Sequence, residues 1–382
     1  MRKFAKILLV LVVVMGLLFY VGGGWYFSSV FKTDALETAP WPQYYETEVV
    51  SFGGAVVTLK EGAHPDEELM DPGVFGLEWS DGYGQLGPFV ENDGTLVTRE
   101  YAPVSGTNPA PGTLADVEAT AFPSDPAVLG RTWQTVEYES ELGPMEAWQV
   151  DGDGSTWAIM VHGKGAGMDE GMRMLSTLSA ANLPTLMISY RNDPNQPADP
   201  SGFYQYGQTE WRDLDAAIDY AGSQGADDLL LVGFSTGAAI ILSYLEQVPD
   251  APSVTGLIFD SPNIDFGATV DYNASQRTLP GIGTKLPQSL TSVAKLLATW
   301  RFGVDWEAIN YINENLRPIP TLVFHGTGDL TVPIETSLRL AAARPETTRL
   351  VEVAGAHHVG SWNANPRQYV LQVAEFLTSL DL

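Results

Sequence analysis

The chain contains no cysteine among its 382 residues. This absence excludes disulfide bonds, thiolate nucleophiles and metal sites built on cysteine, although it leaves the cellular compartment open. Basic residues are also scarce, because 20 Lys and Arg stand against 47 Asp and Glu and give a formal net charge of −27. Phosphate binding depends largely on cations, and no patch rich in Lys or Arg is visible. The composition therefore argues against a nucleic-acid-binding protein.

What is present is typical of a globular protein. Hydrophobic residues make up 45% of the chain and charged residues 18%, which excludes a disordered or fibrous protein. At roughly 150 residues per domain, the length allows one large domain or two smaller ones. A chain of this size can bury most of its apolar surface without disulfides or metals.

The N-terminus has the pattern of a membrane anchor. Arg2, Lys3 and Lys6 precede an uncharged run of 21 residues from Ile7 to Phe27. As a helix rising about 1.5 Å per residue, this run just spans a hydrocarbon core of about 30 Å. The aromatic residues that end the run are placed for the membrane interface. The positive charge before it predicts that the N-terminus lies inside and the bulk of the chain outside the cell membrane.

A cleaved signal peptide is the competing interpretation of this segment. The most apolar part, Ile7 to Val21, has the length of a signal peptide, and Gly22 to Gly24 could supply small residues for cleavage. No A-x-A site is present there. The span length favours an uncleaved anchor over residues 1–31, whereas a cleaved signal would make the protein secreted.

Residues 32–153 form a block rich in Gly, Pro, Asp and Glu. Short alternating runs bounded by turn residues predict strands here, and the stretch from Ser105 to Gly112 predicts a loop. We interpret the block as a β-rich accessory region whose last strands lead into the next sheet, because it holds no internal repeat and no catalytic constellation. The predicted strands are Glu48–Ser51, Ala55–Leu59, Leu96–Tyr101 and Trp133–Tyr138.

A different pattern fills residues 154–382, where short apolar runs alternate with helical segments. Continuous apolar strands between helices are typical of a parallel sheet covered on both faces. Ligands bind such sheets at the carboxyl ends of the strands, so the residues directly after each run are the candidates for chemistry. The predicted strands are Trp157–Val161, Thr185–Tyr190, Leu229–Val232, Gly256–Phe259, Thr321–Phe324 and Leu350–Val353. The predicted helices are Glu170–Ala181, Glu210–Gly222, Ala238–Gln247, Glu335–Arg344 and Gln368–Leu380.

A G-x-S-x-G motif from Gly233 to Gly237 lies between the third of these strands and the helix that follows it. This strand–turn–helix context lifts a serine hydroxyl above the sheet edge, and the tight turn needs residues without bulk two positions to either side. Backbone N–H groups at the start of the helix stabilise developing negative charge. Ser235 is therefore the candidate nucleophile.

A serine nucleophile needs a base, and the base needs an orienting acid. The chain offers only five histidines. Asp329 follows the predicted strand that ends at Phe324, and His358 follows the one that ends at Val353. The chain order Ser, Asp, His, with each residue after a strand, is the order of α/β-hydrolases.

These motifs resemble the α/β-hydrolase superfamily. Within it they resemble the serine hydrolases that include serine aminopeptidases, monoacylglycerol-lipase-like enzymes and membrane-anchored bacterial esterases. The resemblance covers roughly Trp157 to Leu380, and it implies an α/β-hydrolase fold with Ser235 as nucleophile, Asp329 as acid and His358 as base. It also implies a small helical lid at about 263–318, although the apolar residues of that segment could equally serve only to pack on the core.

The segment from Val161 to Gly165 resembles the oxyanion loop of this family. By this resemblance, the backbone amides of Lys164 and Thr236 form the oxyanion hole. The Lys164 side chain is expected to be solvated. His162 and His325 each precede a glycine at a strand end, and packing or hydrogen bonding beneath the site is the favoured role for both.

Alternatives remain at three places near the predicted site. His357 adjoins His358, and because neighbours in an extended chain point opposite ways, only one of them faces the serine. Asp260 ends a strand after which some α/β-hydrolases place the acid, so it competes with Asp329. The polar cluster from Tyr190 to Asp193 follows a strand and either lines the site or holds its loop, the second role being favoured.

The predicted function is a serine hydrolase that cleaves an ester, thioester or amide of a small-molecule or lipid-like acyl substrate through an acyl-enzyme. No metal or organic cofactor is implied. The alternatives are a catalytically inactive, membrane-tethered binding protein on the same fold, or an acyltransferase or cofactor-free lyase that uses the same site. Because an imidazole base must be neutral to accept a proton, activity is expected to fall on acidification.

Overall fold

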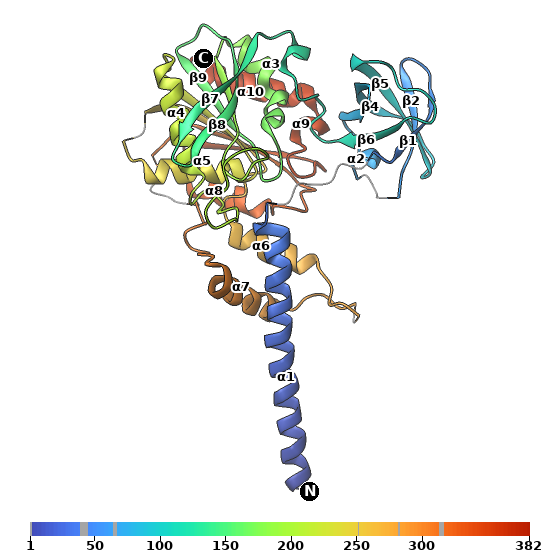
Figure 1. Cartoon of the computed structure of the whole chain (residues 1–382), viewed down its shortest axis with the longest axis vertical. Helices are drawn as coiled ribbons and strands as arrows, with labels where there is room; N and C mark the ends of the chain where they lie inside the picture. The colour runs from blue at the N-terminus through green and yellow to red at the C-terminus, as the bar shows by residue number, and fades with distance from the viewer. Residues whose placement is uncertain (1, 39–44, 64–66, 251, 282, 313–316) are drawn as a thin grey trace.

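The computed structural model describes residues 2–38, 45–63, 67–250, 252–281, 283–312 and 317–382. His64 lies outside these ranges. A long N-terminal helix, a β-barrel and an α/β domain follow one another along the chain. Figure 1 shows the helix projecting away from the α/β domain, with the barrel to one side of that domain.

The N-terminal helix α1 runs over Arg2–Phe31 and continues into a short π-helical turn, η1, over Lys32–Leu36. It is long and apolar enough to cross a membrane, and the described side chains of its first two thirds are nearly all exposed. Glycine is a poor helix former, yet Gly23 and Gly24 lie well inside α1. A Cβ atom at Gly24 would lie 2.6 Å from Val293, so these glycines allow a second helix to approach closely.

Residues 47–118 form a closed antiparallel β-barrel. Its strands are β1 (Thr47–Phe52), β2 (Val56–Lys60), β3 (Phe75–Trp79), β4 (Gly82–Asn92), β5 (Leu96–Gly106) and β6 (Leu114–Glu118), with a helical turn α2 (Glu67–Met70). They lie in the order β1-β2-β5-β4-β3-β6, and β6 pairs again with β1, which leaves no open strand edge. The core is apolar around Val49, Leu77 and Val117. It also holds the buried Arg99, whose guanidinium donates to four backbone carbonyls.

An eight-stranded sheet is the centre of the α/β domain in the described part of the chain. Its strands are β7 (Trp133–Ser140), β8 (Gly143–Val150), β9 (Thr156–Val161), β10 (Thr185–Ile188), β11 (Asp228–Phe234), β12 (Ser253–Asp260), β13 (Thr321–Gly326) and β14 (Thr348–Val353). The order is β14-β13-β12-β11-β9-β10-β8-β7. The strands from β14 to β10 are parallel, and β8 and β7 extend the sheet as an antiparallel hairpin.

The sheet is mostly parallel, as predicted, but it begins earlier in the chain than the predicted block at residue 154. The predicted strand Trp133–Tyr138 lies within β7 and belongs to this sheet, as does β8, which was not predicted. Antiparallel edge strands alternate polar and apolar residues, and that alternation does not reveal which of two sheets they join.

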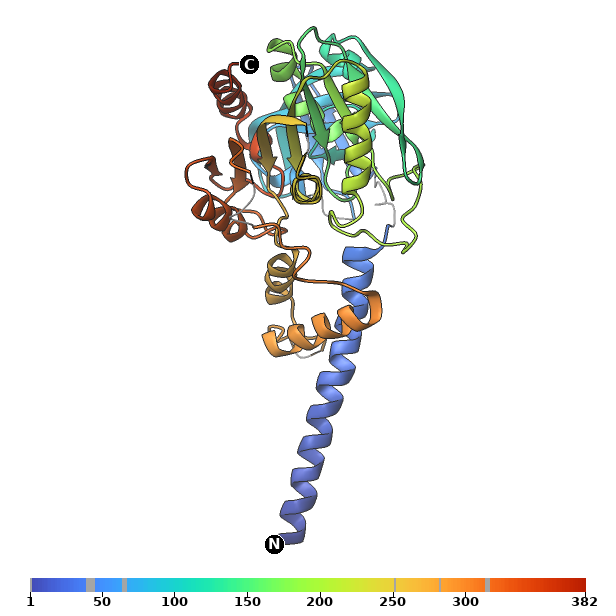
Figure 2. The ribbon, with the colours of Figure 1, turned by 90° about the vertical axis from the view of Figure 1, so that its left-hand side faces the viewer.

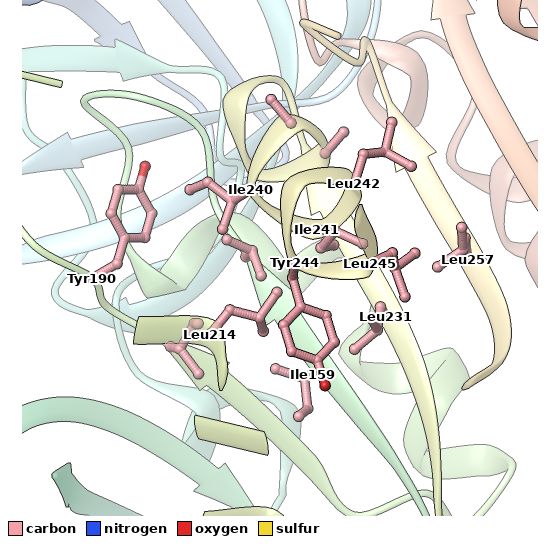
Figure 3. Close-up of a cluster of buried hydrophobic side chains, with 14 of the residues drawn as sticks. Ile159, Tyr190, Leu214, Leu231, Ile240, Ile241, Leu242, Tyr244, Leu245 and Leu257 are labelled. Atoms are coloured by element: carbon pink, nitrogen blue, oxygen red, sulfur yellow. The ribbon is translucent and has the colours of Figure 1, made fainter. Parts of the chain in front are cut away.

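Helices cover both faces of the sheet. The helices of this domain are α3 (Met172–Ala180), α4 (Trp211–Ser223), α5 (Thr236–Gln247), α6 (Phe266–Gln276), α7 (Gln288–Phe302), α8 (Glu335–Ala343), α9 (Ser361–Ala364) and α10 (Pro366–Ser379), with 3₁₀ turns η2 (Pro126–Leu129) and η3 (Met168–Gly171). In β11, Leu229 and Leu231 point toward the cluster formed with α4 and α5, whereas Leu230 and Val232 point toward the cluster formed with α3 and α10. Figure 3 shows the first cluster, with side chains of α5 packed over the strands. Burial on both faces explains why these strands are continuous apolar runs.

Two helices, α6 and α7, lie between β12 and β13 in the chain, within the segment 263–318 that the sequence singles out. They lie at the end of the α/β domain from which α1 projects (Figure 1). Figure 2 shows α7 lying across α1 below the domain. The N-terminal helix and this inserted segment are therefore neighbours, although more than 230 residues of sequence separate them.

Candidate active site

Ser235 occupies a strained turn between β11 and α5. Its backbone has φ 48° and ψ −114°, a region that non-glycine residues rarely adopt. A Cβ atom at Gly237 would lie 2.0 Å from the carbonyl oxygen of Val161, and one at Gly233 would lie 2.6 Å from the amide nitrogen of Ala238. The two motif glycines are therefore required by close backbone packing around the serine.

The structure brings Ser235, His358 and Asp329 together at the carboxyl ends of β11, β14 and β13. The Ser235 hydroxyl lies 2.9 Å from Nε2 of His358. Nδ1 of His358 lies 2.8 Å from a carboxylate oxygen of Asp329. With the ring proton on Nδ1 donated to the carboxylate, Nε2 is free to accept the serine proton, which is the arrangement of a nucleophile, a base and an orienting acid.

The Asp329 carboxylate is held as an anion by several donors. Its second oxygen accepts 2.8 Å hydrogen bonds from the backbone amides of Thr331 and Val332. Burial alone raises the pKa of this carboxyl, but hydrogen bonds from His325 and His358 outweigh burial and hold the pKa well below its usual range. Asp329 is therefore charged at neutral pH.

The two rivals to these assignments point elsewhere. Nδ1 of His357 lies 3.3 Å from the Asp71 carboxylate, away from Ser235. Asp260 is buried beneath the site and accepts a 2.8 Å hydrogen bond from the Ser361 hydroxyl. Burial raises the pKa of Asp260 to about 6. Adjacent histidines thus face opposite sides, and the carboxylate that touches the His358 ring belongs to Asp329.

The predicted oxyanion loop follows β9 and lies against the serine. A Cβ atom at Gly163 would lie 3.1 Å from Cβ of Ser235. The Gly163 amide donates a 2.7 Å hydrogen bond to the Glu170 carboxylate, which fixes the loop from behind. Sequence reasoning missed Glu170, because a lone acid near the start of a predicted helix is also typical of simple charge compensation. Lys164 and Thr236, the predicted amide donors, line the same cavity as Ser235.

His162 supports this loop from below, in the role favoured from the sequence. Its Nε2 lies 2.9 Å from the Asp193 carboxylate and its Nδ1 2.8 Å from the Gly163 carbonyl oxygen. Both partners accept hydrogen bonds, so both ring nitrogens carry a proton. Burial lowers the pKa of His162, but the charge of Asp193 and the hydrogen bond to it outweigh burial and raise the pKa to about 9.

The polar cluster after β10 also holds loops and does not line the cavity. The Arg191 guanidinium makes two hydrogen bonds of 2.7 and 2.9 Å to the Asp213 carboxylate, and both side chains are buried. Asp193 binds His162 and the backbone amide of Tyr190. The structural role predicted for this cluster is confirmed.

The Lys164 side chain departs from expectation. It is half-buried, and its ammonium donates a 2.8 Å hydrogen bond to the carbonyl oxygen of Asp34 in η1. The same ammonium lies 5.5 Å from the centre of the Tyr204 ring. The prediction of a solvated Lys164 side chain is therefore wrong, because the η1 turn lies over the loop and supplies an acceptor.

A cavity of about 320 Å³ opens at Ser235 and His358. One wall is the end of the sheet, and the other is made of helices. Residues from α6 and α7 contribute to it, including Phe266, Val270 and Ala294. The remaining part of the helical wall comes from the N-terminal segment, with Phe27, Val30, Phe31, Asp34 and Ala35. Sequence reasoning did not predict this contribution, because an apolar run gives no sign of which side chains face a cavity.

The barrel matches a known family model of undefined activity. Residues 48–118 match a domain of unknown function (DUF8805), which covers β1 to β6 almost entirely.

Relatives by sequence match a little over half of the chain at low identity. The uncharacterized protein YfhR of Escherichia coli O157:H7 is 26% identical over 208 residues, which are 54% of this chain and 63% of that protein. The YfhR of Escherichia coli strain K12 is 25% identical over 225 residues, or 58% of this chain and 69% of that protein. The chain thus covers less than two thirds of the first of these relatives.

Solved structures share the architecture over a longer span. The Pyrococcus furiosus esterase Pf2001 superposes with a TM-score of 0.51 and 19% identity, covering 68% of this chain and 96% of the esterase. At that identity the likeness concerns the fold alone. Together with the strand order and the turn at Ser235, it identifies the chain as a protein of the α/β-hydrolase fold.

Proposed function

We propose that this protein is a serine hydrolase that cleaves an ester, thioester or amide through an acyl-enzyme on Ser235. The observation that carries the proposal is the unbroken chain of hydrogen bonds from the Ser235 hydroxyl through His358 to Asp329, at 2.9 and 2.8 Å, at the mouth of a cavity. Ester cleavage is the preferred reaction, since Pf2001, one of the solved structures that share the fold, is an esterase.

In this mechanism the Ser235 oxygen attacks the acyl carbon while its proton passes to Nε2 of His358. The carbonyl π electrons move to the carbonyl oxygen, and the backbone amides of Lys164 and Thr236 are proposed to stabilise that oxyanion. When the tetrahedral intermediate collapses, His358 gives the proton to the leaving group. Water then adds to the acyl-enzyme with His358 again as the base, and the acid product and the free Ser235 hydroxyl are released.

We further propose that α1 is an uncleaved anchor with its N-terminus inside and the other domains outside the membrane. The packing of Gly23 and Gly24 against α7 supports retention of this segment, as does the presence of Phe27 to Ala35 in the cavity wall. Signal cleavage at the three glycines would remove part of this packing. The segment 263–318 is proposed to act as the lid and the barrel as an accessory domain.

Labelling and turnover test the proposed function in the full-length chain held in detergent micelles. A fluorophosphonate probe should label the wild type and leave Ser235→Ala unlabelled. His358→Ala should lower the rate on 4-nitrophenyl butyrate by roughly 10⁴-fold or more, because serine and base act as a unit. His357→Ala is the matched control and should retain a rate within about threefold of wild type.

Each alternative has its own result in this assay. A wild type that takes no label and hydrolyses neither esters nor aminoacyl amides would contradict the proposal and favour a binding protein on the same fold. An acyl-enzyme that transfers to an added alcohol faster than to water would instead identify an acyltransferase.

A further inference from the structure

The cavity wall formed by α1 continues directly from the apolar surface of that helix. Phe19 lies about three helical turns before Val30 and Tyr20 about two turns before Phe27, so these two partly exposed side chains lie on the same face of α1 as the cavity residues. Phe27 and Val30, which follow on the same helix, line the cavity that contains Ser235. An acyl chain lying along α1 therefore meets apolar side chains along its way to the serine, and burying that chain is favoured by the hydrophobic effect.

Helix α7 is fixed against the interfacial part of α1. The Arg301 guanidinium donates to the Trp25 carbonyl at 3.1 Å and to the hydroxyls of Ser28 and Ser29 at 2.6 and 2.9 Å. At the other end, the Tyr20 hydroxyl lies 3.0 Å from that of Ser289. Helix α7 crosses α1 (Figure 2) and contacts Trp25, one of the aromatic residues predicted for the membrane interface. It therefore lies at the level where a bilayer would end.

The outer face of α7 exposes large apolar side chains at this level. Leu296 is 70% exposed and Trp300 is 74% exposed, and they lie one helical turn apart. The Trp300 ring lies 6.5 Å from that of Trp25, itself half exposed. The opposite face of α7 is buried through Leu290 and Ala294. A helix with one face on the protein and a second apolar face open is built to lie in a membrane interface.

The charge of this region is opposite to that of the chain as a whole. Residues 272–304 contain no Asp or Glu, although the chain carries a net charge of −27. Arg277 and Lys295 in this stretch pair with Asp34 and Asp271, at 2.6 and 2.9 Å, and Lys285 and Arg301 are its other two basic residues. A cationic segment beside exposed Trp and Leu fits a lipid surface, where basic residues are attracted to anionic headgroups.

We infer that α7 lies in the headgroup layer of the bilayer that α1 spans, and that the cavity takes its acyl substrate from that bilayer along α1. The substrate class is an acyl ester of a membrane-resident amphiphile. Its acyl chain packs against Phe27, Val30 and the α6–α7 residues, and its carbonyl reaches Ser235. The inference rests on the proposed function, and it adds where the substrate comes from and which helices hold it.

Two esters separate this inference from the proposed function. The full-length chain is reconstituted in vesicles of phosphatidylcholine and phosphatidylglycerol. Rates are measured on water-soluble 4-nitrophenyl acetate and on 4-methylumbelliferyl oleate held in the bilayer. The variant Leu296→Ser/Trp300→Ser removes the exposed apolar face of α7, and Val370→Ser/Leu371→Ser on α10 is the matched control, since those residues are also exposed apolar side chains.

The rate of the α7 variant on the bilayer ester should be about tenfold or more below that of the wild type, because the mouth of its cavity no longer lies in the interface. Its rate on the soluble ester should stay within about twofold, which also reports that the variant is folded. The α10 variant should match the wild type on both esters. An equal loss on both esters, or no loss on either, would overturn the inference while the proposed function stands. A wild type inactive on both would overturn both.

A second measurement reports the position of α7 directly. Because the chain has no cysteine, Leu296→Cys can be labelled at one site with an environment-sensitive fluorophore. In the same vesicles its emission should be blue-shifted and quenched by brominated lipid, whereas the label on Leu371→Cys should behave as if in water. A label at 296 that is shielded but not reached by brominated lipid would assign the face to a protein partner and overturn the inference.

Discussion

The cavity has two walls that are held in different ways. The rim, meaning the loops after β9, β11, β13 and β14, is fixed by buried charged hydrogen bonds such as those of Asp329 and His162. The helical wall, meaning Phe27–Ala35 with α6 and α7, is held by apolar packing and by half-exposed ion pairs. The Arg277–Asp34 pair is one of these, at 2.6 Å with side chains 47% and 49% exposed.

This difference in stabilising contacts matches the proposed role of each wall in the reaction. Proton transfer needs the reacting atoms held to within about half an ångström, which buried charged hydrogen bonds achieve. Exposed ion pairs contribute only about 0–1 kcal/mol each. The rim therefore supports a fixed chemistry. The helical wall supports selection among acyl groups, where packing against apolar side chains decides affinity.

The largest effect on kcat is expected at Asp329, the charged rim residue that contacts the proposed base His358. Asp329→Asn should lower kcat by roughly 10⁴-fold, because the amide no longer holds the His358 ring in the required tautomer. Asp260→Asn is the matched control. It changes a carboxylate that hydrogen-bonds Ser361, and it should cost less than about tenfold. The reverse ranking in steady-state assays would move the acid to Asp260 and contradict the assignment.

The buried ion pair beneath the rim predicts a pH-dependent stability. The pKa of His162 in the folded protein is raised to about 9, above its usual value of about 6.5. The resulting stabilisation is complete below about pH 6.5 and is lost as the pH rises through about 9, an effect on the order of 3 kcal/mol.

Thermal unfolding at pH 6.5 and pH 10 measures this loss. Between these two pH values, the Tm of the wild type should fall by several degrees more than the Tm of His162→Gln. If the Tm of the variant and the Tm of the wild type fall by the same amount, the His162–Asp193 pair does not stabilise the rim.

Glu170 offers a smaller test of the rim. Its carboxylate accepts the Gly163 amide at 2.7 Å and so positions the oxyanion loop. Glu170→Ala should lower kcat by about 10- to 100-fold with KM nearly unchanged, since a hydrogen bond to a charged group contributes about 1.5–3 kcal/mol. Glu170→Gln keeps an acceptor and should recover most of the rate. If both variants keep wild-type kcat, the loop is positioned by other contacts.

Much of the rim could be predicted from the sequence because its residues follow strands. The apolar runs at 157–161 and 229–232 fall within β9 and β11, and Ser235 follows the second of them. Strands buried on both faces leave a signal that needs no alternation. Once the strands are placed, parallel topology brings their carboxyl ends to one edge, so Asp329 and His358 could be expected beside the serine.

The barrel and the helical wall were harder to predict. The strands β1, β2 and β5 are confirmed, but β3, β4 and β6 were not predicted. In β4 three glycines weaken the pattern of a strand. A Cβ atom at Gly84 would lie 2.3 Å from the Tyr101 ring, so tertiary packing decides that residue. In α1 an all-round apolar run predicts a membrane helix. It carries no periodicity that would mark Val30 as facing a cavity.

The helical wall can be tested by filling the cavity from α1. Val30 lines the cavity at Ser235, whereas Val21 on the same helix is 60% exposed and lies outside the lining. Val30→Trp adds bulk to a space of about 320 Å³. It should slow long-chain esters about tenfold, since one or a few methylenes of lost packing correspond to about 1–3 kcal/mol.

The rate of Val30→Trp on the acetyl ester should stay within about twofold of wild type, because the rim that performs the chemistry is unchanged. Val21→Trp is the control and should show the same dependence of rate on acyl-chain length as the wild type. Measured as kcat/KM over esters of graded length, the variant should shift the optimum toward shorter chains. A uniform loss at every length would mean that α1 acts on the chemistry of the rim. The proposal that the rim performs the chemistry and the helical wall selects the acyl group would then be wrong. Val30, 205 positions before Ser235 in the chain, would be controlling the reactivity of the serine and not the choice of acyl group.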